Sequence, residues 1–183
     1  MASDALKDFV SGYSIEVVPN SAAKVESFAE TLPANTRVYI AHLSEKEDIK
    51  TMVATAKRIN AEGFSVMPHI PARIIKDKNM LTEWLSMYQN EANVSEALLL
   101  AGGSSQPLGE FDSSMQLIET GEFDKLGFTR LHVAGHPEGS KDIDPDGGKK
   151  NTSSALSWKQ EFSKRTDAKM AIATQFCFDA NTV

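Results

Sequence analysis

Residues 37–70 read RVYIAHLSEKEDIKTMVATAKRINAEGFSVMPHI, and this stretch decides the fold class. The apolar runs at 37–41 and 65–70 predict two strands. Between them, residues 45–61 carry apolar side chains at three- and four-residue spacing, which predicts an amphipathic helix that ends near Gly63. A strand–helix–strand order of this length is typical of two parallel strands joined by a crossover helix.

The same alternation repeats along the whole chain. Most strands are nearly continuous apolar runs, which is expected when both faces of a parallel sheet are covered. The repeat therefore predicts about six βα steps in a single α/β domain spanning residues 1–183. The further strands are predicted at 13–18, 97–100, 130–134 and 170–178, and the further helices at 21–31, 79–90, 113–123 and 152–166.

Polar residues follow nearly every predicted strand. Both doubly wound sheets and closed barrels bind ligands at that edge, but contributions from so many strands favour a (β/α)8 barrel. A closed barrel needs about two more βα units than we count, so we expect the chain to be incomplete after Val183. The strand-end residues are Glu16, His42, His69, Gly102, Gly103, His136 and Gln175.

Composition narrows the class of partner. The net charge is −6 and no run of Lys or Arg exceeds two residues, which argues against nucleic acid. No apolar stretch is long enough to cross a bilayer, and the first ten residues lack the apolar core of a signal peptide. The single cysteine, Cys177, permits no internal disulfide. We therefore expect a soluble cytoplasmic protein.

Several segments, in this order, resemble the methylenetetrahydrofolate reductase family. The first is SIEVVP at 14–19, the second is PH at 68–69, and the third is the loop GGSSQPLGEF at 102–111. GHPEG at 135–139 and TQFCFD at 174–179 complete the set. Each segment alone is weak, but together they cover nearly the whole chain in the family's order.

The resemblance implies an enzyme built on a barrel that binds FAD across the carboxyl ends of its strands. NADH or NADPH would reduce the flavin, and the flavin would reduce 5,10-methylenetetrahydrofolate to 5-methyltetrahydrofolate in one-carbon and methionine metabolism. A folate substrate is thus implied, together with a homo-oligomer in the full-length form.

The resemblance also suggests roles for individual residues. Glu16 matches the family's acid, and its apolar neighbours suggest a partly desolvated carboxyl suited to general acid catalysis. Gln175 would hydrogen-bond the pterin, because a carboxamide both donates and accepts. The residues expected to bind the cofactor are His42, His69, Gly102, Gly103, Ser104, His136 and Arg165.

Plainer interpretations stay open for these residues. Glu16 could be an edge glutamate in solvent, Gln175 a cap on the sheet, and His69 a structural histidine. Arg165, beside Lys164, could belong to a solvated helix face.

One departure from the family concerns the loop after the fourth strand. Many members carry Arg-Gly-Asp there, whereas this chain has Gly102-Gly103-Ser104 and no acid before Glu110. The absence of that acid leaves a second hypothesis open, a folate-dependent methyl-transfer or demethylation protein on the same barrel. A third hypothesis is a non-catalytic remnant that keeps part of the folate or flavin face.

Overall fold

A computed structural model describes residues 4–183 and contains one six-stranded sheet in which all neighbouring strands are parallel. The strands follow one another in chain order, without the reversal that defines a doubly wound sheet. The predicted α/β parallel class is confirmed, and the doubly wound alternative is excluded. The strands are β1 (Ser14–Val17), β2 (Arg37–Ile40), β3 (Ser65–Pro71), β4 (Glu96–Leu100), β5 (Arg130–Gly135) and β6 (Lys169–Thr174).

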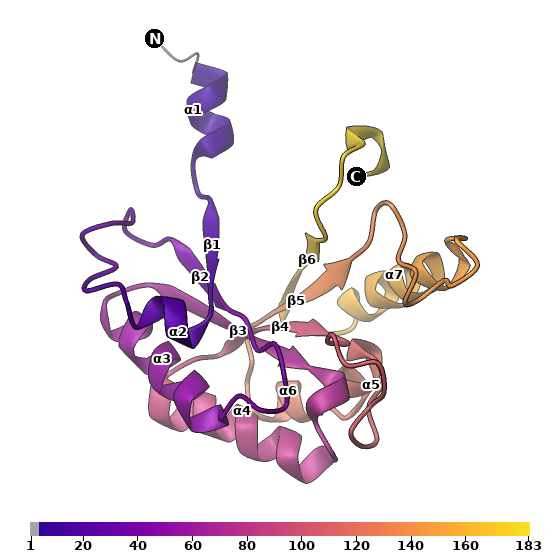
Figure 1. Ribbon diagram of the computed structural model, residues 1–183, viewed down its shortest axis with the longest axis horizontal. Coiled ribbons are helices and arrows are strands. Elements are labelled where there is room, and N and C mark those ends of the chain that lie inside the picture. Colours follow the sequence, from indigo (N-terminus) through magenta and orange to yellow (C-terminus); the bar gives the residue numbers. More distant parts are fainter. Residues whose placement is uncertain (1–3) are drawn as a thin grey trace.

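The sheet is curled like half of a barrel, as side-chain contacts between strands that are not neighbours show. The hydroxyl of Tyr39 on β2 lies 2.7 Å from Nδ1 of His132 on β5. In a flat sheet, three strand spacings would separate these strands by about 14 Å. The contact therefore requires a concave face across which opposite strands approach each other (Figure 1).

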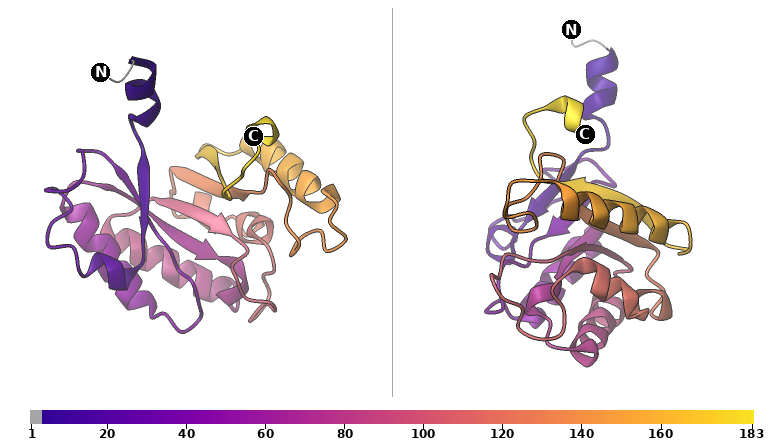
Figure 2. Two further views of the ribbon diagram at one scale, coloured as in Figure 1. Left: turned by 45° about the horizontal axis from the view of Figure 1, so that its top comes forward. Right: turned by 90° about the vertical axis from the view of Figure 1, so that its right-hand side faces the viewer.

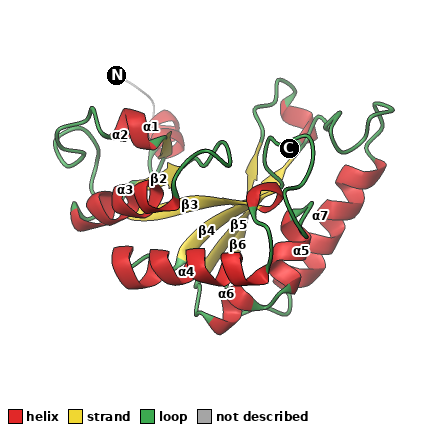
Figure 3. Ribbon diagram, turned by 60° about the horizontal axis from the view of Figure 1, so that its bottom comes forward, coloured by secondary structure: helices red, strands yellow, loops and turns green. Residues whose placement is uncertain are grey.

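The connecting helices cover the other, convex face. Right-handed crossovers between consecutive strands place every helix on the same side, and Figure 3 shows the long helices arranged around that side. The connecting helices are α2 (Pro19–Ala22), α3 (Ile49–Ala61), η1 (Ala72–Ile74), α4 (Lys78–Ala92), α5 (Ser114–Glu119), α6 (Glu122–Lys125) and α7 (Lys150–Ser163). α1 (Asp4–Val10) precedes β1, and η2 (Ala180–Thr182) follows β6.

The hydrophobic core lies between the convex face and helices α3 and α4. Leu81, Leu85 and Tyr88 of α4 are fully buried, as are Ile70 of β3 and Leu99 of β4. The helical spacing of the apolar residues in α4 therefore produces a continuous stripe that packs on the sheet. This packing fixes the strands whose carboxyl ends carry the polar residues.

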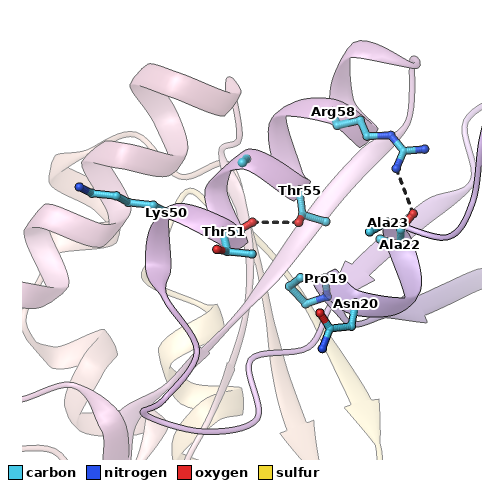
Figure 4. A pocket seen from close by; sticks show the side chains of 9 residues that line it. Pro19, Asn20, Ala22, Ala23, Lys50, Thr51, Thr55 and Arg58 are labelled. Atoms are coloured by element: carbon cyan, nitrogen blue, oxygen red, sulfur yellow. Dashed lines mark hydrogen bonds between the residues drawn. The ribbon is translucent and has the colours of Figure 1, made fainter.

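The predicted helix at 21–31 is wrong, because only Pro19–Ala22 is helical there. Arg58 of α3 donates to the carbonyls of Ala22, Val25 and Glu26, as Figure 4 shows for Ala22. These bonds satisfy carbonyl groups that would otherwise require a helix or solvent. A pocket of about 460 Å³ lies beside them, between α2 and α3 on the helix-covered side.

Other elements also differ from the prediction; for example, α3 begins at Ile49 rather than at 45 and α7 ends at Ser163 rather than at 166. The helix at 113–123 is divided into α5 and α6 at Gly121, whose φ of +73° ends a helix. β6 ends at Thr174 rather than at 178, because its partner β5 ends at Gly135. The helix α1 was not anticipated; it buries none of its side chains and stands away from the sheet (Figures 1 and 2).

Candidate active site

Glu16 and His69 meet at the carboxyl edge of the sheet. Oε2 of Glu16 lies 3.1 Å from Nε2 of His69, within ion-pair distance but without the alignment of a hydrogen bond. The two residues come from β1 and β3, so the curl of the sheet brings them together. The strand-end positions therefore place a carboxyl and an imidazole on one concave rim.

Burial distinguishes the two partners. His69 is 7% exposed, and burial lowers the pKa of its imidazole although the Glu16 carboxylate opposes this effect. Glu16 is not desolvated as its sequence neighbours suggested, because 57% of its side chain remains exposed. The pair therefore combines a buried neutral ring with a carboxyl that a ligand can reach.

Tyr39 and His132 form a second pair, deeper in the concave face. Burial raises the pKa of the Tyr39 phenol and lowers the pKa of His132 to about 4. Arg37 and Arg130 add to the lowering at His132, and its Nε2 is buried without a hydrogen-bond partner in the described residues. The Tyr39 ring also meets the His69 ring edge-on at a centroid distance of 6.4 Å, so the two pairs are in contact.

Charged residues close the amino-terminal end of the concave face. Glu96 on β4 pairs with Arg37 on β2 at 3.1 Å and with Arg130 on β5 at 3.4 Å. These side chains are about three-quarters buried. Glu96 offsets only one of the two positive charges, and the pairs hold three strands together, which is a structural role.

The loop after β4 begins with a backbone that only glycine adopts easily. Gly102 has a φ of +98°, and a Cβ there would lie 3.0 Å from Cβ of Pro71. At Gly103, by contrast, a Cβ would meet nothing within 4 Å, so the backbone is open to a ligand on that side. Ser104 follows, half-buried, and its carbonyl accepts from Arg73.

A pocket of about 380 Å³ lies where the carboxyl ends of β5 and β6 meet α7. Its walls include His136, Lys149 and Lys159. Lys159 is 9% exposed and donates to the carbonyl of Ala134 at 2.8 Å, but no carboxylate of the described residues pairs with it. Burial lowers the pKa of its ammonium group, and burial together with Lys159 lowers the pKa of His136. A buried cation without a counter-charge favours an anionic ligand.

Glu138 joins the two family-like segments that follow β5 and β6. Its Oε1 accepts from the backbone N–H groups of Phe178 and Asp179, at 2.6 and 2.8 Å. Gln175 donates its backbone N–H to Gly135, and its side chain is exposed at the same edge with no hydrogen bond to the described residues. The carboxamide of Gln175 is therefore available to a ligand.

Two side chains that we expected to contact the cofactor, those of His42 and Arg165, do not face the concave side of the sheet. His42 points into the helix layer, where it is 3% exposed and stacks on Trp84 of α4 at a centroid distance of 5.0 Å. Arg165 lies after the end of α7, near the amino end of β6, with its guanidinium over the rings of Phe162 and Trp158. Arg165 is therefore not at the edge that carries Glu16 and His69. His42 lies close enough to His69 to help lower its pKa, but its ring packs in the helix layer.

Sequence reasoning missed Tyr39, His132 and Lys159. Both Tyr39 and His132 occupy strand positions that alternate with core residues, so strict two-residue periodicity could have placed them on the concave face. Lys159 precedes the buried Phe162 by three positions, which puts both on one face of α7. The apolar residues on this face of the predicted helix were the sequence signal that could have identified Lys159 as buried.

Compared with models of known protein families, the chain matches none. Within residues 4–183, no helix is both long and apolar enough to cross a membrane. Nor do these residues contain a group of three or more His, Cys, Asp or Glu side chains placed to hold a metal ion.

Proposed function

We propose that the chain is a methylenetetrahydrofolate reductase-like flavoprotein of the (β/α)8-barrel type, which uses NADH or NADPH to reduce a folate substrate. The observation that carries the proposal is that the family-like segments lie together in space. The segments that resemble the family end β1, β3, β4, β5 and β6, and all of them gather at one edge of the sheet. Five weak matches that assemble on one edge support a shared site more strongly than five separate matches do.

The residues at this edge suit FAD. Lys149 and Lys159 would face its diphosphate, since Lys159 is buried beside the pocket without an acidic partner. The open side of Gly103 would admit a flat ring close to the backbone. When bound, FAD supplies the transfer of hydride between the nicotinamide and the folate.

Glu16 is the proposed general acid. The methylene bridge of the folate must open to an iminium ion before it can accept hydride, and opening requires a proton on the bridging nitrogen. Glu16 is exposed enough to reach a ligand, and His69 at 3.1 Å limits the positions that its carboxyl can take. Gln175 would bind the pterin through its free carboxamide, and Tyr39 with His132 would support the His69 ring from below.

Glu16→Gln tests this assignment in the two half-reactions. We expect flavin reduction by the nicotinamide to stay nearly unchanged, while folate reduction slows by about 10²–10⁴-fold, the usual contribution of a general acid. Stopped-flow absorbance of the flavin measures both rates. Glu91→Gln is the matched control, since it alters an exposed glutamate near the end of α4, before β4 begins. Equal losses in both half-reactions of Glu16→Gln would contradict its role as the acid.

A second candidate is a folate-dependent methyl-transfer or demethylation protein, and the loop after β4 favours it. That loop lacks the family's acid beside the glycines. The later Asp112 does not replace it, because its carboxylate forms an ion pair with Arg73 at 2.7 Å. Such a protein would bind folate but carry no flavin. The visible spectrum of the purified chain distinguishes the two, because bound flavin absorbs blue light and bound folate does not.

A further inference from the structure

Arg73 lies directly after β3, in η1, and its backbone is tied to the loop that follows β4. Its N–H donates to the carbonyl of Ala101 at 2.9 Å, and its carbonyl accepts from the N–H of Leu108 at 2.7 Å. These two bonds bracket the glycine segment at 102–104. The backbone of Arg73 therefore fixes both ends of the part of the loop that begins the candidate cofactor site.

The side chain of Arg73 reaches further and joins a second loop. Its Nε donates to Oδ1 of Asp112 at 2.7 Å, and its Nη1 donates to Oδ2 of Asp142 at 2.9 Å and to the carbonyl of Ser104 at 3.1 Å. Asp112 ends the loop after β4, whereas Asp142 belongs to the loop after β5 that also carries His136 and Lys149. The Arg73 side chain is 12% exposed, whereas the side chains of Asp112 and Asp142 are 61% and 56% exposed, so the guanidinium is held between two loops that face solvent.

In the part of the chain that the structure describes, no group of three or more His, Cys, Asp or Glu side chains is placed to hold a metal ion, and Asp142 instead faces Arg73. The neighbouring acids of its DIDPDG segment are engaged locally: Asp144 caps the start of α7 by accepting from Asn151 and Thr152, and Asp146 accepts from Gly148. The carboxylate of Asp142 pairs with Nη1 of Arg73 at 2.9 Å. The acids of this segment therefore shape the loop after β5, and Asp142 connects that loop to Arg73 directly after β3.

We propose that Arg73 is a positioning residue that couples the loops after β4 and β5, and so sets the spacing between Gly102–Ser104 and the Lys149–Lys159 pocket. This inference rests on the proposed function only where it concerns FAD. A ligand as long as FAD must contact both places at once, so its affinity depends on their spacing. Without Arg73, Asp112 and Asp142 would repel each other and the two loops would move independently.

Hydrogen exchange tests the coupling without any ligand. In Arg73→Ala we expect amides in both loops, 102–112 and 136–149, to lose protection together, while those of α4 keep it. Asp142→Asn, which weakens one link alone, should release mainly the second loop. Lys164→Ala is the matched control, since Lys164 pairs with Glu161 at the opposite end of the sheet. Unchanged exchange of both loops in Arg73→Ala would overturn the proposal.

Titration with FAD, followed by flavin fluorescence, tests the consequence for binding. We expect Arg73→Ala to raise the Kd for FAD by on the order of tenfold, as lost hydrogen bonds to charged groups do. Arg73→Lys should recover part of the affinity, because a lysine reaches one carboxylate at a time. If Arg73→Ala loosens both loops but leaves the affinity for FAD unchanged, Arg73 has no positioning role in FAD binding. If the wild-type chain binds no FAD, the proposed function fails, and the exchange experiment alone decides whether Arg73 couples the loops.

Discussion

The two halves of the sheet are covered very differently. α4 buries Leu81, Trp84, Leu85, Tyr88 and Ala92 against the strands at the centre, whereas α7 buries only Lys159 and Phe162. Correspondingly, Ile70 of β3 is fully buried, but Ile172 of β6 is 50% exposed. The first half therefore supplies the stability that holds Tyr39 and His69, and the second half, with its buried lysine and open pocket, supplies the surface for a ligand.

We expect the largest effect from a pair of matched side-chain truncations, one in the helix that covers each half of the sheet. Leu85→Ala in α4 removes a side chain with no exposure, and such changes cost about 2–5 kcal/mol in the free energy of unfolding. Leu156→Ala in α7 alters a leucine that is 46% exposed, so we expect a cost below about 1 kcal/mol. Urea unfolding followed by circular dichroism measures both values. Similar costs for the two variants would show that the halves do not differ in this way.

Acid should weaken the contact that joins the halves. The folded-state pKa of His132 is lowered, so the folded chain binds fewer protons than the unfolded chain below the ordinary histidine pKa of 6.5. The contribution of His132 to stability is therefore fully present above pH 6.5, falls as the pH drops towards about 4, and levels off below that value. The fall from 6.5 to about 4 corresponds to about 3 kcal/mol for His132, and the lowered pKa values of His42, His69 and His136 act in the same direction.

Urea unfolding at several pH values between 7 and 4 measures this loss. His132→Gln removes the titrating ring, so its stability should depend less steeply on pH than that of the wild type. Identical slopes for the variant and the wild type would mean that His132 does not titrate as its burial and the neighbouring Arg37 and Arg130 require.

The smallest expected effect concerns the uncovered half. Ile172, Leu156 and Met170 line a groove of about 450 Å³ between β6 and α7, and an exposed apolar groove promotes self-association. Ile172→Thr should weaken that association about fivefold, as expected for removing half of a buried isoleucine from a contact. Sedimentation over a range of concentrations measures it. Ile70→Thr, at a buried position, should instead unfold the chain, and an equal effect of both changes on association would contradict the comparison.

Much of the fold could be predicted because periodicity reports burial. Residues 49–61 and 78–92 repeat apolar side chains at helical spacing, and the strand between them, β3, is largely apolar, so the identity and order of these elements followed. The irregular segment at 23–36 could not be predicted, because two side chains distant in sequence, Arg58 of α3 and Glu62 just after it, bind its backbone. The sequence of the segment itself gives no sign of these contacts with distant side chains.

The candidate site could be predicted only at the strand ends. Glu16, His69, Gly102, His136 and Gln175 follow directly from the rule that ligands meet the carboxyl edge of a parallel sheet. Tyr39 and His132 lie inside strands, and their contact depends on the curl of the sheet. Arg165 was predicted from the family resemblance and His42 from its position after a strand. The direction of α7 carries Arg165 to the amino end of β6, and the alternation of β2 turns the His42 ring into the helix layer.

FAD binding by the 183-residue chain tests the central claim most directly. We expect flavin fluorescence to be quenched with one FAD bound per chain, and Lys159→Met, which removes the buried positive charge but keeps the apolar stem, to weaken that binding at least tenfold. Lys164→Met, at the far end of α7, should bind as the wild type does. A folded chain that leaves FAD fluorescence unchanged, or one in which both variants bind equally well, would contradict the account.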